Sequence, residues 1–400
     1  MKRPALPISI ILILSTIVSA QQTEDPTKPL KVYLLVGQSN MQGHARIHTL
    51  EHVGMDSKTE SIFATLADED GVPKTFDQVW INSLSPSGIK KGNLTAGFGA
   101  DDDKIGPELA FGAFIQPLVG EPILIIKIAW GGKSLHTDFR SPSPGEFQFS
   151  ESQIARFKKQ QKDLNEIKEK KKQATGEHYR LMINHVKSVL GDIKATYPSY
   201  DLDAGYELSG FVWFQGWNDM VDGGVYPERG KEGGFDEYSK WLAHFIRDVR
   251  SDLAAPNLPF VIGVMGVGGP TERYNSQQRR NKAVHQSFRK AMLAPAKLPE
   301  FKDNVAAVLT EKYWDQELAA LRARQAKIDG QIRKAKKEEG LKQSAVRELR
   351  EKMMSEEFSD EELSVMKKGI SNLEYHYLGS AKIMTQIGKA FAEKMNELAK

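Results

Sequence analysis

Residues 32–43 read VYLLVGQSNMQG, a short apolar run that breaks into a polar turn with Ser39 near its apex. A run of this kind bounded by glycine is typical of a buried strand. Gly37 and Gly43 permit backbone angles that a side chain would forbid, so the Ser39 hydroxyl and N–H can face a binding site instead of the core. The pattern predicts a strand that ends in a nucleophile turn, although an ordinary polar turn has the same appearance.

Three later segments supply partners for this turn. They are ILIIKIAWGGKSL at 123–135, FVWFQGWND at 211–219, and EYHYLGS at 374–380, which contains His376 and precedes the last helical pattern. The first two are again apolar strands that run into polar loops. Parallel strands bring their carboxyl ends to one edge of a sheet, where such sheets bind ligands. We therefore expect the four loops to converge on one site.

The turn GQSN at 37–40, the loop WGGKSL at 130–135, the block FQGWND at 214–219 and His376 together resemble the SGNH hydrolases. The likeness is greatest to the sialate O-acetylesterase and acetylxylan esterase branch of carbohydrate esterases, and it extends over residues 31–395. The resemblance implies a three-layer α/β/α, flavodoxin-like fold with a central parallel sheet and helical insertions. It also implies a serine esterase that removes O-acetyl groups from sialic acid, xylan or a similar glycan and needs no cofactor.

In a serine esterase a base takes the hydroxyl proton as the oxygen attacks, and preplaced donors hold the oxyanion of the tetrahedral intermediate. Ser39 is the candidate nucleophile. His376 is the candidate base, because imidazole titrates near neutral pH. By resemblance, the oxyanion donors are the N–H groups of Ser39 and Gly132 and the side-chain amide of Asn218, with Gln215 as the substitute for Asn218.

The carboxylate that should orient the base is missing from its usual place. The superfamily usually has an aspartate three residues before the histidine, where this chain has Leu373. Glu374 is the nearest carboxylate and our candidate for the acid, and Asp315 is the substitute from another loop. A backbone carbonyl would leave a Ser-His dyad. The alternative function is a catalytically weak or inactive carbohydrate-binding protein on the same scaffold.

Four further loop residues are candidate substrate contacts: Gln38, Asn40, Lys133 and Trp217. Trp217 lies in a polar loop, and an aromatic face suits the C–H surface of a pyranose. Trp130 and Trp213 stand at the ends of apolar strands, so we expect them to pack in the core.

Composition excludes several other classes of function. The chain has 400 residues, of which 40% are apolar, enough for one α/β domain with a large core. A net charge of +3 is too small to indicate a nucleic-acid binder. There is no glycine-rich phosphate loop, and the nine histidines are too scattered to predict a metal site.

The amino terminus reads as a targeting segment. It begins with MKR, continues through a mostly apolar stretch at 8–18, and reaches the small residues VSA at 18–20. We predict a signal peptide at 1–20, cleaved after Ala20, and a linker at 21–30. The apolar stretch is too short for a comfortable membrane span, so we expect no membrane insertion after cleavage. The alternative is that the segment is retained as an anchor. The protein is predicted to be periplasmic or secreted.

We predict one esterase domain at 31–400 with two helical insertions. A Lys/Glu-rich helix is expected at 151–175, and a charge run of this kind is usually a solvated face. A helical hairpin is expected at 316–368, where apolar residues recur at helical steps and Ser359 begins a capping box. The hairpin fits a lid, a dimer arm or a spacer, and a structural or adhesion protein is a third hypothesis. Residues 51–103 are expected to form loops.

Overall fold

The computed structural model describes residues 28–276 and 278–400. The predicted signal peptide and the linker up to residue 27 lie outside the described residues. The main sheet has the strand order β4-β3-β6-β1-β7-β8-β9, and every neighbouring pair is parallel except β3 with β4. The strands are β1 (Leu30–Gly37), β3 (Phe76–Ser85), β4 (Gly88–Leu94), β6 (Ile123–Ala129), β7 (Tyr206–Phe214), β8 (Phe260–Val264) and β9 (Val305–Leu309).

The central position belongs to β1, which lies between β6 and β7. In the register of these parallel pairs, Gly37 stands opposite both Ala129 and Phe214. The three strands therefore end at the same edge of the sheet, and the loops that follow them begin side by side. This register is what brings the predicted motifs together.

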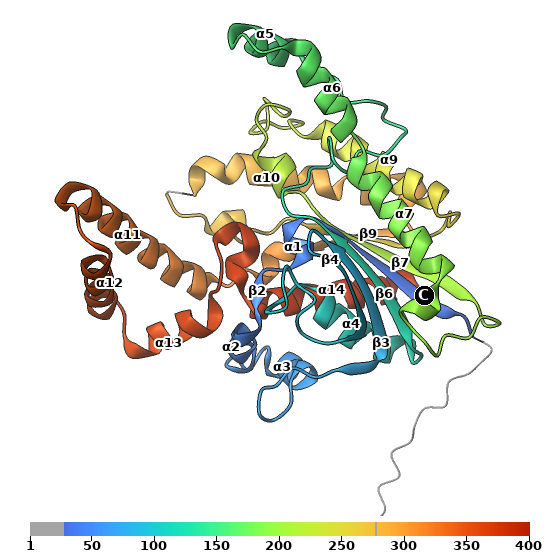
Figure 1. Ribbon diagram of the computed structural model, residues 1–400, viewed down its shortest axis with the longest axis horizontal. Helices are drawn as coiled ribbons and strands as arrows, with labels where there is room; N and C mark the ends of the chain where they lie inside the picture. The colour runs from blue at the N-terminus through green and yellow to red at the C-terminus, as the bar shows by residue number, and fades with distance from the viewer. Residues whose placement is uncertain (1–27, 277) are drawn as a thin grey trace, which may run out of the picture.

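Helices cover both faces of the sheet, so the fold is α/β with three layers (Figure 1). Two consecutive residues of β7 show the two sides, because Trp213 packs on Phe245 of α9 and Phe214 packs on Phe391 of α14. The helices are α1 (Ser39–Gln42), α2 (Leu50–Gly54), α3 (Glu60–Leu66), α4 (Glu108–Val119), α7 (Glu177–Gly191), α8 (Trp217–Val221), α9 (Asp236–Asp252), α10 (Arg279–Leu293) and α14 (Ala381–Leu398). A small ribbon of β2 (Ala45–Arg46) and β5 (Lys104–Ile105) lies beside the main sheet.

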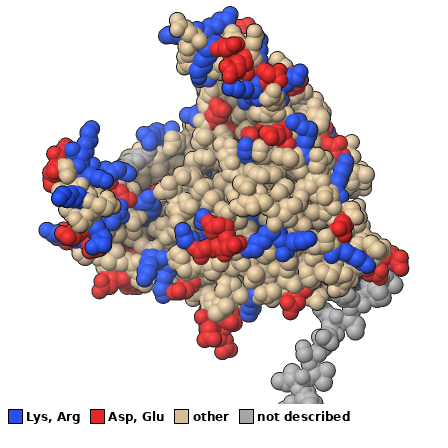
Figure 2. Space-filling model, viewed as in Figure 1, with Lys and Arg blue, Asp and Glu red and all other residues tan. Residues whose placement is uncertain are grey.

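Two helical arms project from this body (Figure 1). One consists of α5 (Glu151–Lys159) and α6 (Leu164–Ala174), and the other of α11 (Gln316–Glu339), α12 (Gln343–Glu357) and α13 (Asp360–Gly369). The second arm has a small apolar core of its own, made by Leu321, Ile328, Ile332, Phe358 and Met366. Its predicted capping box is present, since the Ser359 hydroxyl accepts from the backbone N–H of Glu362. Both arms carry mixed positive and negative charge, as expected for solvated helices (Figure 2).

The expectation of loops at 51–103 is wrong. This segment contains α2, α3 and the strands β3 and β4. The strand β3 escapes recognition because its buried end is polar, with Asn82 and Ser83 both enclosed. Asn82 donates to the hydroxyl of Thr196 at 2.9 Å, which satisfies the buried amide. Among the helices of the described residues, none is long and apolar enough to cross a membrane.

Candidate active site

Ser39 is the first residue of α1, at the carboxyl end of the central strand. Its side chain is 7% exposed. The preceding Gly37 lies so close to β7 that a Cβ atom there would be 2.1 Å from the carbonyl oxygen of Phe214. Only glycine permits this approach. The turn that carries Ser39, the predicted nucleophile, therefore packs tightly against the neighbouring strand.

A buried ion pair lies under the same turn. Lys127, on β6, donates from Nζ to Glu108 Oε2 at 2.6 Å, to the Phe98 carbonyl at 2.7 Å and to the Gln42 carbonyl at 2.9 Å. Both charged side chains are almost without exposed surface. Burial lowers the pKa of Lys127, and Glu108 partly offsets this effect. The bond to Gln42 ties the last residue of α1 to the sheet.

Gln38 joins the nucleophile turn to α8. Its Oε1 accepts from the backbone N–H of Gly216 at 3.0 Å, and its Nε2 donates to Asn218 Oδ1 at 3.0 Å. The Asn218 amide is oriented by its oxygen, and its NH₂ group finds no acceptor within the described part of the chain. Asn218 can therefore donate a hydrogen bond to an incoming oxyanion, as the sequence predicts.

The loop at 130–135, called the glycine loop below, begins next to Ser39. A Cβ atom on Gly131 would lie 3.9 Å from that of Ser39. Gly132 has φ of +75°, and a Cβ atom there would meet nothing within 4 Å. The need for glycine at 132 thus comes from its left-handed backbone, not from crowding by protein atoms.

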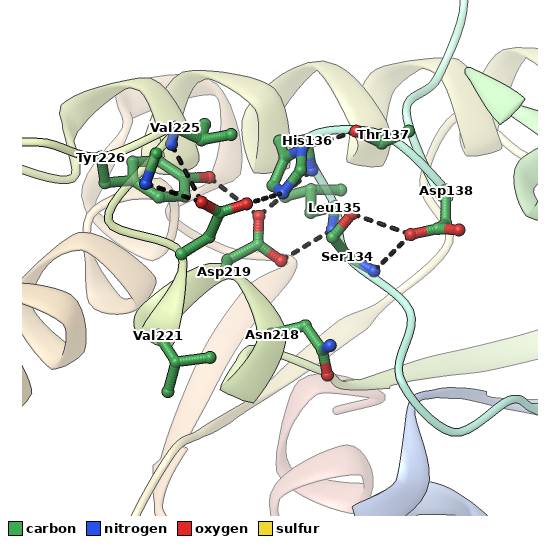
Figure 3. Close-up of polar contacts among 12 residues, drawn as sticks. Ser134, Leu135, His136, Thr137, Asp138, Asn218, Asp219, Val221, Val225 and Tyr226 are labelled. Atoms are coloured by element: carbon green, nitrogen blue, oxygen red, sulfur yellow. Dashed lines mark hydrogen bonds and ion pairs between the residues drawn. The ribbon is translucent and has the colours of Figure 1, made fainter. Parts of the chain in front are cut away.

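Asp219 holds the backbone of this loop (Figure 3). Its fully buried carboxylate accepts from the N–H groups of Leu135 at 2.8 Å and His136 at 3.1 Å, and from the Tyr226 hydroxyl at 2.8 Å. Four donors in all surround it, the fourth being Gln215 Nε2 at 2.7 Å. A buried charge so fully satisfied positions the loop and is not free for chemistry.

Gln215 is therefore not the substitute oxyanion donor that the sequence suggests. Its Nε2 donates to Asp219 and, at 3.0 Å, to the carbonyl of Lys133. Its Oε1 accepts from the Tyr238 hydroxyl at 3.2 Å. The side chain is fully buried, and both amide hydrogens are used within the protein.

A second set of polar contacts involves His136 and Asp138 of the same loop (Figure 3). His136 Nε2 lies 3.4 Å from Asp222 Oδ2, and this contact is the largest cause that lowers the pKa of Asp222 to about 2. Asp138 accepts from the backbone and hydroxyl of Ser134, both at 2.8 Å, and lies 3.3 Å from the ammonium of Lys133. Lys133 is thus paired, with its side chain 31% exposed.

His376 lies in η7 (Glu374–Gly379), a short irregular helix that packs against α1. Its Nδ1 is 3.2 Å from Asn372 Oδ1. A carbonyl oxygen can only accept, so Nδ1 carries the proton and Nε2 is left as the basic nitrogen. Burial is the main cause that lowers the pKa of His376 to about 4, and Lys104 adds to it. The ring is therefore neutral at pH 7, as a general base requires.

Neither predicted carboxylate reaches this ring, which corrects the sequence-based assignment. Glu374 is half exposed, and its Oε1 lies 3.8 Å from Nε of Arg322. Asp315 caps α11 by accepting from the N–H of Leu318 at 3.0 Å, and it pairs with Lys382 at 3.0 Å. Because η7 is a helical turn, the side chains of Glu374 and His376, two residues apart, point in different directions. The group that orients the ring is therefore the Asn372 amide.

Two predicted substrate contacts also need correction. Gln38 is 0% exposed and Asn40 is 1% exposed, so neither offers surface to a substrate. Asn40 instead faces the sulfur of Met265, at 4.0 Å. Trp217 does have exposed surface, and its ring lies 5.8 Å from that of Tyr375. Trp130 and Trp213 are buried in the core as predicted.

In the part of the chain that the structure describes, no hydrogen bond joins Ser39 Oγ to the His376 ring. Such bonds are often long in ligand-free enzymes and shorten when the substrate binds. The site as a whole offers a hydroxyl at a helix start, a neutral imidazole, and an unpaired amide beside a glycine loop. These are the parts that acyl transfer requires.

Sequence reasoning missed three residues of this site. His44 stacks on His376, and its only signal is that it directly follows Gly43. Asn372 is an amide four residues before His376, and a pattern that requires a carboxylate does not select it. Lys127 is visible as the single charge within ILIIKIA, the usual mark of a buried partner. The described residues contain no group of three or more His, Cys, Asp or Glu placed to bind a metal ion.

A family model described as "Carbohydrate esterase, sialic acid-specific acetylesterase" matches residues 29–306, more than half of the chain. No curated protein matches. Solved structures that match include a protein from Arabidopsis thaliana, with 16% identity, TM-score 0.39, and coverage of 70% of this chain and 85% of that one. Another is a carbohydrate acetylesterase from Xanthomonas citri, with 15% identity, TM-score 0.37, and coverage of 70% of this chain but only 50% of that enzyme.

Proposed function

The chain belongs to the sialic acid-specific acetylesterase family of carbohydrate esterases and acts at that level as a carbohydrate acetylesterase; on this premise, we propose an exported SGNH-type serine esterase that works through Ser39 and His376. The proposed substrate is an O-acetyl ester on a sialic acid, a xylan or a similar glycan. Export rests on the sequence of residues 1–20, whose pattern is that of a signal peptide.

In the first step, Ser39 Oγ attacks the acetyl carbonyl carbon while His376 Nε2 takes the hydroxyl proton. The carbonyl oxygen becomes an oxyanion between the N–H groups of Ser39 and Gly132 and the Asn218 amide. The C–O bond to the sugar then breaks, and the protonated His376 returns its proton to the departing sugar oxygen. The acetyl group stays on Ser39 as an ester.

In the second step, water replaces the sugar. His376 Nε2 takes a proton from the water as its oxygen attacks the acetyl-enzyme, and the same donors hold the second oxyanion. The bond to Ser39 Oγ breaks, His376 returns the proton to that oxygen, and acetate leaves. The free enzyme is regenerated, and one ester and one water have become one sugar hydroxyl and one acetic acid.

Two aromatic side chains support a sugar as the group that carries the ester. Trp217, on α8, and Tyr375, beside the base, have ring centroids 5.8 Å apart and planes 35° apart. Tyr375 is 36% exposed. Rings that keep exposed surface next to a reactive group suit the apolar face of a pyranose.

The observation that carries the proposal is the bond from Gln38 to Asn218. It joins the residue before Ser39 to the predicted oxyanion donor, and leaves the donor's NH₂ group without an acceptor in the described chain. A donor left free beside the Ser39 turn is what oxyanion binding requires. The rival hypothesis of a sugar-binding protein rests on the absence of a carboxylate at His376.

The test is acetate release from p-nitrophenyl acetate, acetylated xylan and O-acetylated sialic acid. We expect Ser39→Ala and His376→Ala each to lower kcat by about 10⁴-fold or more. The matched controls, Ser61→Ala and His48→Ala, change exposed residues and should retain activity. An unmodified chain that binds these glycans but releases no acetate would instead establish the binding protein.

A further inference from the structure

The rings of His44 and His376 lie face to face. Their centroids are 4.0 Å apart and their planes differ by 2°. His44 follows α1 directly and precedes β2, which packs against η7. The contact is reinforced by a bond from the N–H of Arg46 to the hydroxyl of Ser371 at 3.0 Å. The segment that carries the nucleophile thus also covers one face of the base.

His376 lacks the carboxylate that usually orients a catalytic histidine. The Asn372 oxygen selects the Nδ1–H tautomer, but a neutral amide brings no full negative charge to the imidazolium that forms during acyl transfer. One hydrogen bond also leaves the ring free to rotate about that bond. A second ring stacked on its face removes this freedom.

We propose that His44 is a positioning residue for the base: it holds the plane of His376 and covers one face of its ring. The inference rests on the proposed function. The stacked ring also keeps water from that face of His376, in line with the burial that lowers the pKa of the base. His44 and Asn372 together orient the ring, which the missing acid would usually do.

Burial, together with the charges around the stack, keeps His44 neutral. Burial, His376 and Lys104 lower the pKa of His44 to about 3, against a smaller opposite effect of Asp101, and Lys127 lowers it further. Lys104 pairs with Asp101 at 2.6 Å. On the η7 side, the nearby Glu374 is paired with Arg322 of α11.

Kinetics test this role with two substitutions. We expect His44→Ala to lower kcat for p-nitrophenyl acetate by about tenfold with little change in KM, because a small misplacement of a catalytic group is costly. His44→Phe keeps a stacked face and should stay within about threefold of the unmodified enzyme. The control His48→Ala changes an exposed histidine on the same segment. Equal losses in the Ala and Phe variants, or no loss in either, would overturn the proposal.

The pH dependence of activity shows in which direction His44 shifts the pKa of His376. The base must be neutral, so activity falls as pH drops through the pKa of His376, about 4. Removing the His44 ring admits water and should raise that pKa toward 6.5. The His44→Ala loss should therefore be larger at about pH 5 than at about pH 7.5. A purely structural role would lower activity equally at both.

NMR titration of the His376 ring reads the same effect without turnover. We expect a rise in its pKa in His44→Ala and almost none in His44→Phe, each compared with the unmodified chain. An inactive chain that shows this rise would refute the esterase and leave the stacking role standing. If the chain is active but His44→Ala changes neither its kcat nor the pKa of His376, the stacking role alone is refuted.

Discussion

The two halves of the candidate site are held in different ways. Three contacts fix the turn that carries Ser39. Lys127 donates to a carbonyl of α1, Gly37 packs closely on β7, and Gln38 accepts from the backbone before α8. His376 lies on η7, where Tyr377 has φ of 52° and Leu378 has φ of 61°. Left-handed angles are uncommon for such side chains, so the surroundings of η7 must impose them.

The main anchor of η7 is the Tyr377 hydroxyl. It accepts from the N–H of Gly266 at 2.8 Å and lies 2.6 Å from the hydroxyl of Thr310. Ser39, the proposed nucleophile, is thus held by backbone packing and a buried ion pair, whereas His376, the proposed base, is held by one tyrosine, one amide and one stacked ring. Changes on the side of the proposed nucleophile should mainly cost stability, and changes on the side of the proposed base should cost rate as well as stability.

The largest expected effect is on the nucleophile side. Lys127→Met leaves the buried Glu108 carboxylate without its partner and removes donors from two carbonyls. We expect a loss of about 3–5 kcal/mol in the free energy of unfolding, measured by urea denaturation. The control Lys31→Met breaks an exposed pair with Glu207 and should cost about 0–1 kcal/mol. A similar small loss for both would mean that the turn does not depend on the buried pair.

The next effect is on the base side. Tyr377→Phe leaves the Gly266 N–H and the Thr310 hydroxyl short of a partner, and we expect a loss of about 1–3 kcal/mol in unfolding free energy. Because η7 is then less well held, kcat should fall as well. Tyr206→Phe is the control, since Tyr206 is exposed at the start of β7, away from the site. A stable Tyr377→Phe variant with full activity would show that the strained turn needs no such anchor.

The smallest effect separates the two candidate partners of the base. Asn372→Ala should lower kcat by about tenfold, or about 1.4 kcal/mol, because His376 loses its orienting acceptor. Glu374→Gln should stay within about twofold, since its carboxylate faces Arg322 and not the ring. The measurement is kcat for acetate release. The reverse ranking would restore Glu374 as the acid.

Much of the fold follows from local sequence. Buried parallel strands such as 123–129 and 260–264 are continuous apolar runs, and the arms show helical spacing with a capping box. The strand β3 could not be recognised, because its polar residues are satisfied by partners distant in sequence, such as Thr196. Local patterns report burial only where the buried side chains are apolar.

The sequence by itself determined the turn at Ser39, the glycine loop and the order of the blocks, because glycine positions and apolar runs act on neighbouring residues. Only the tertiary structure decided which side chains remain free for chemistry. Gln215 and Gln38 are consumed by buried bonds, Glu374 turns toward Arg322, and Asn372 and His44 reach His376. Hydrogen-bond partners are allocated by packing between distant segments, and no local pattern encodes that allocation.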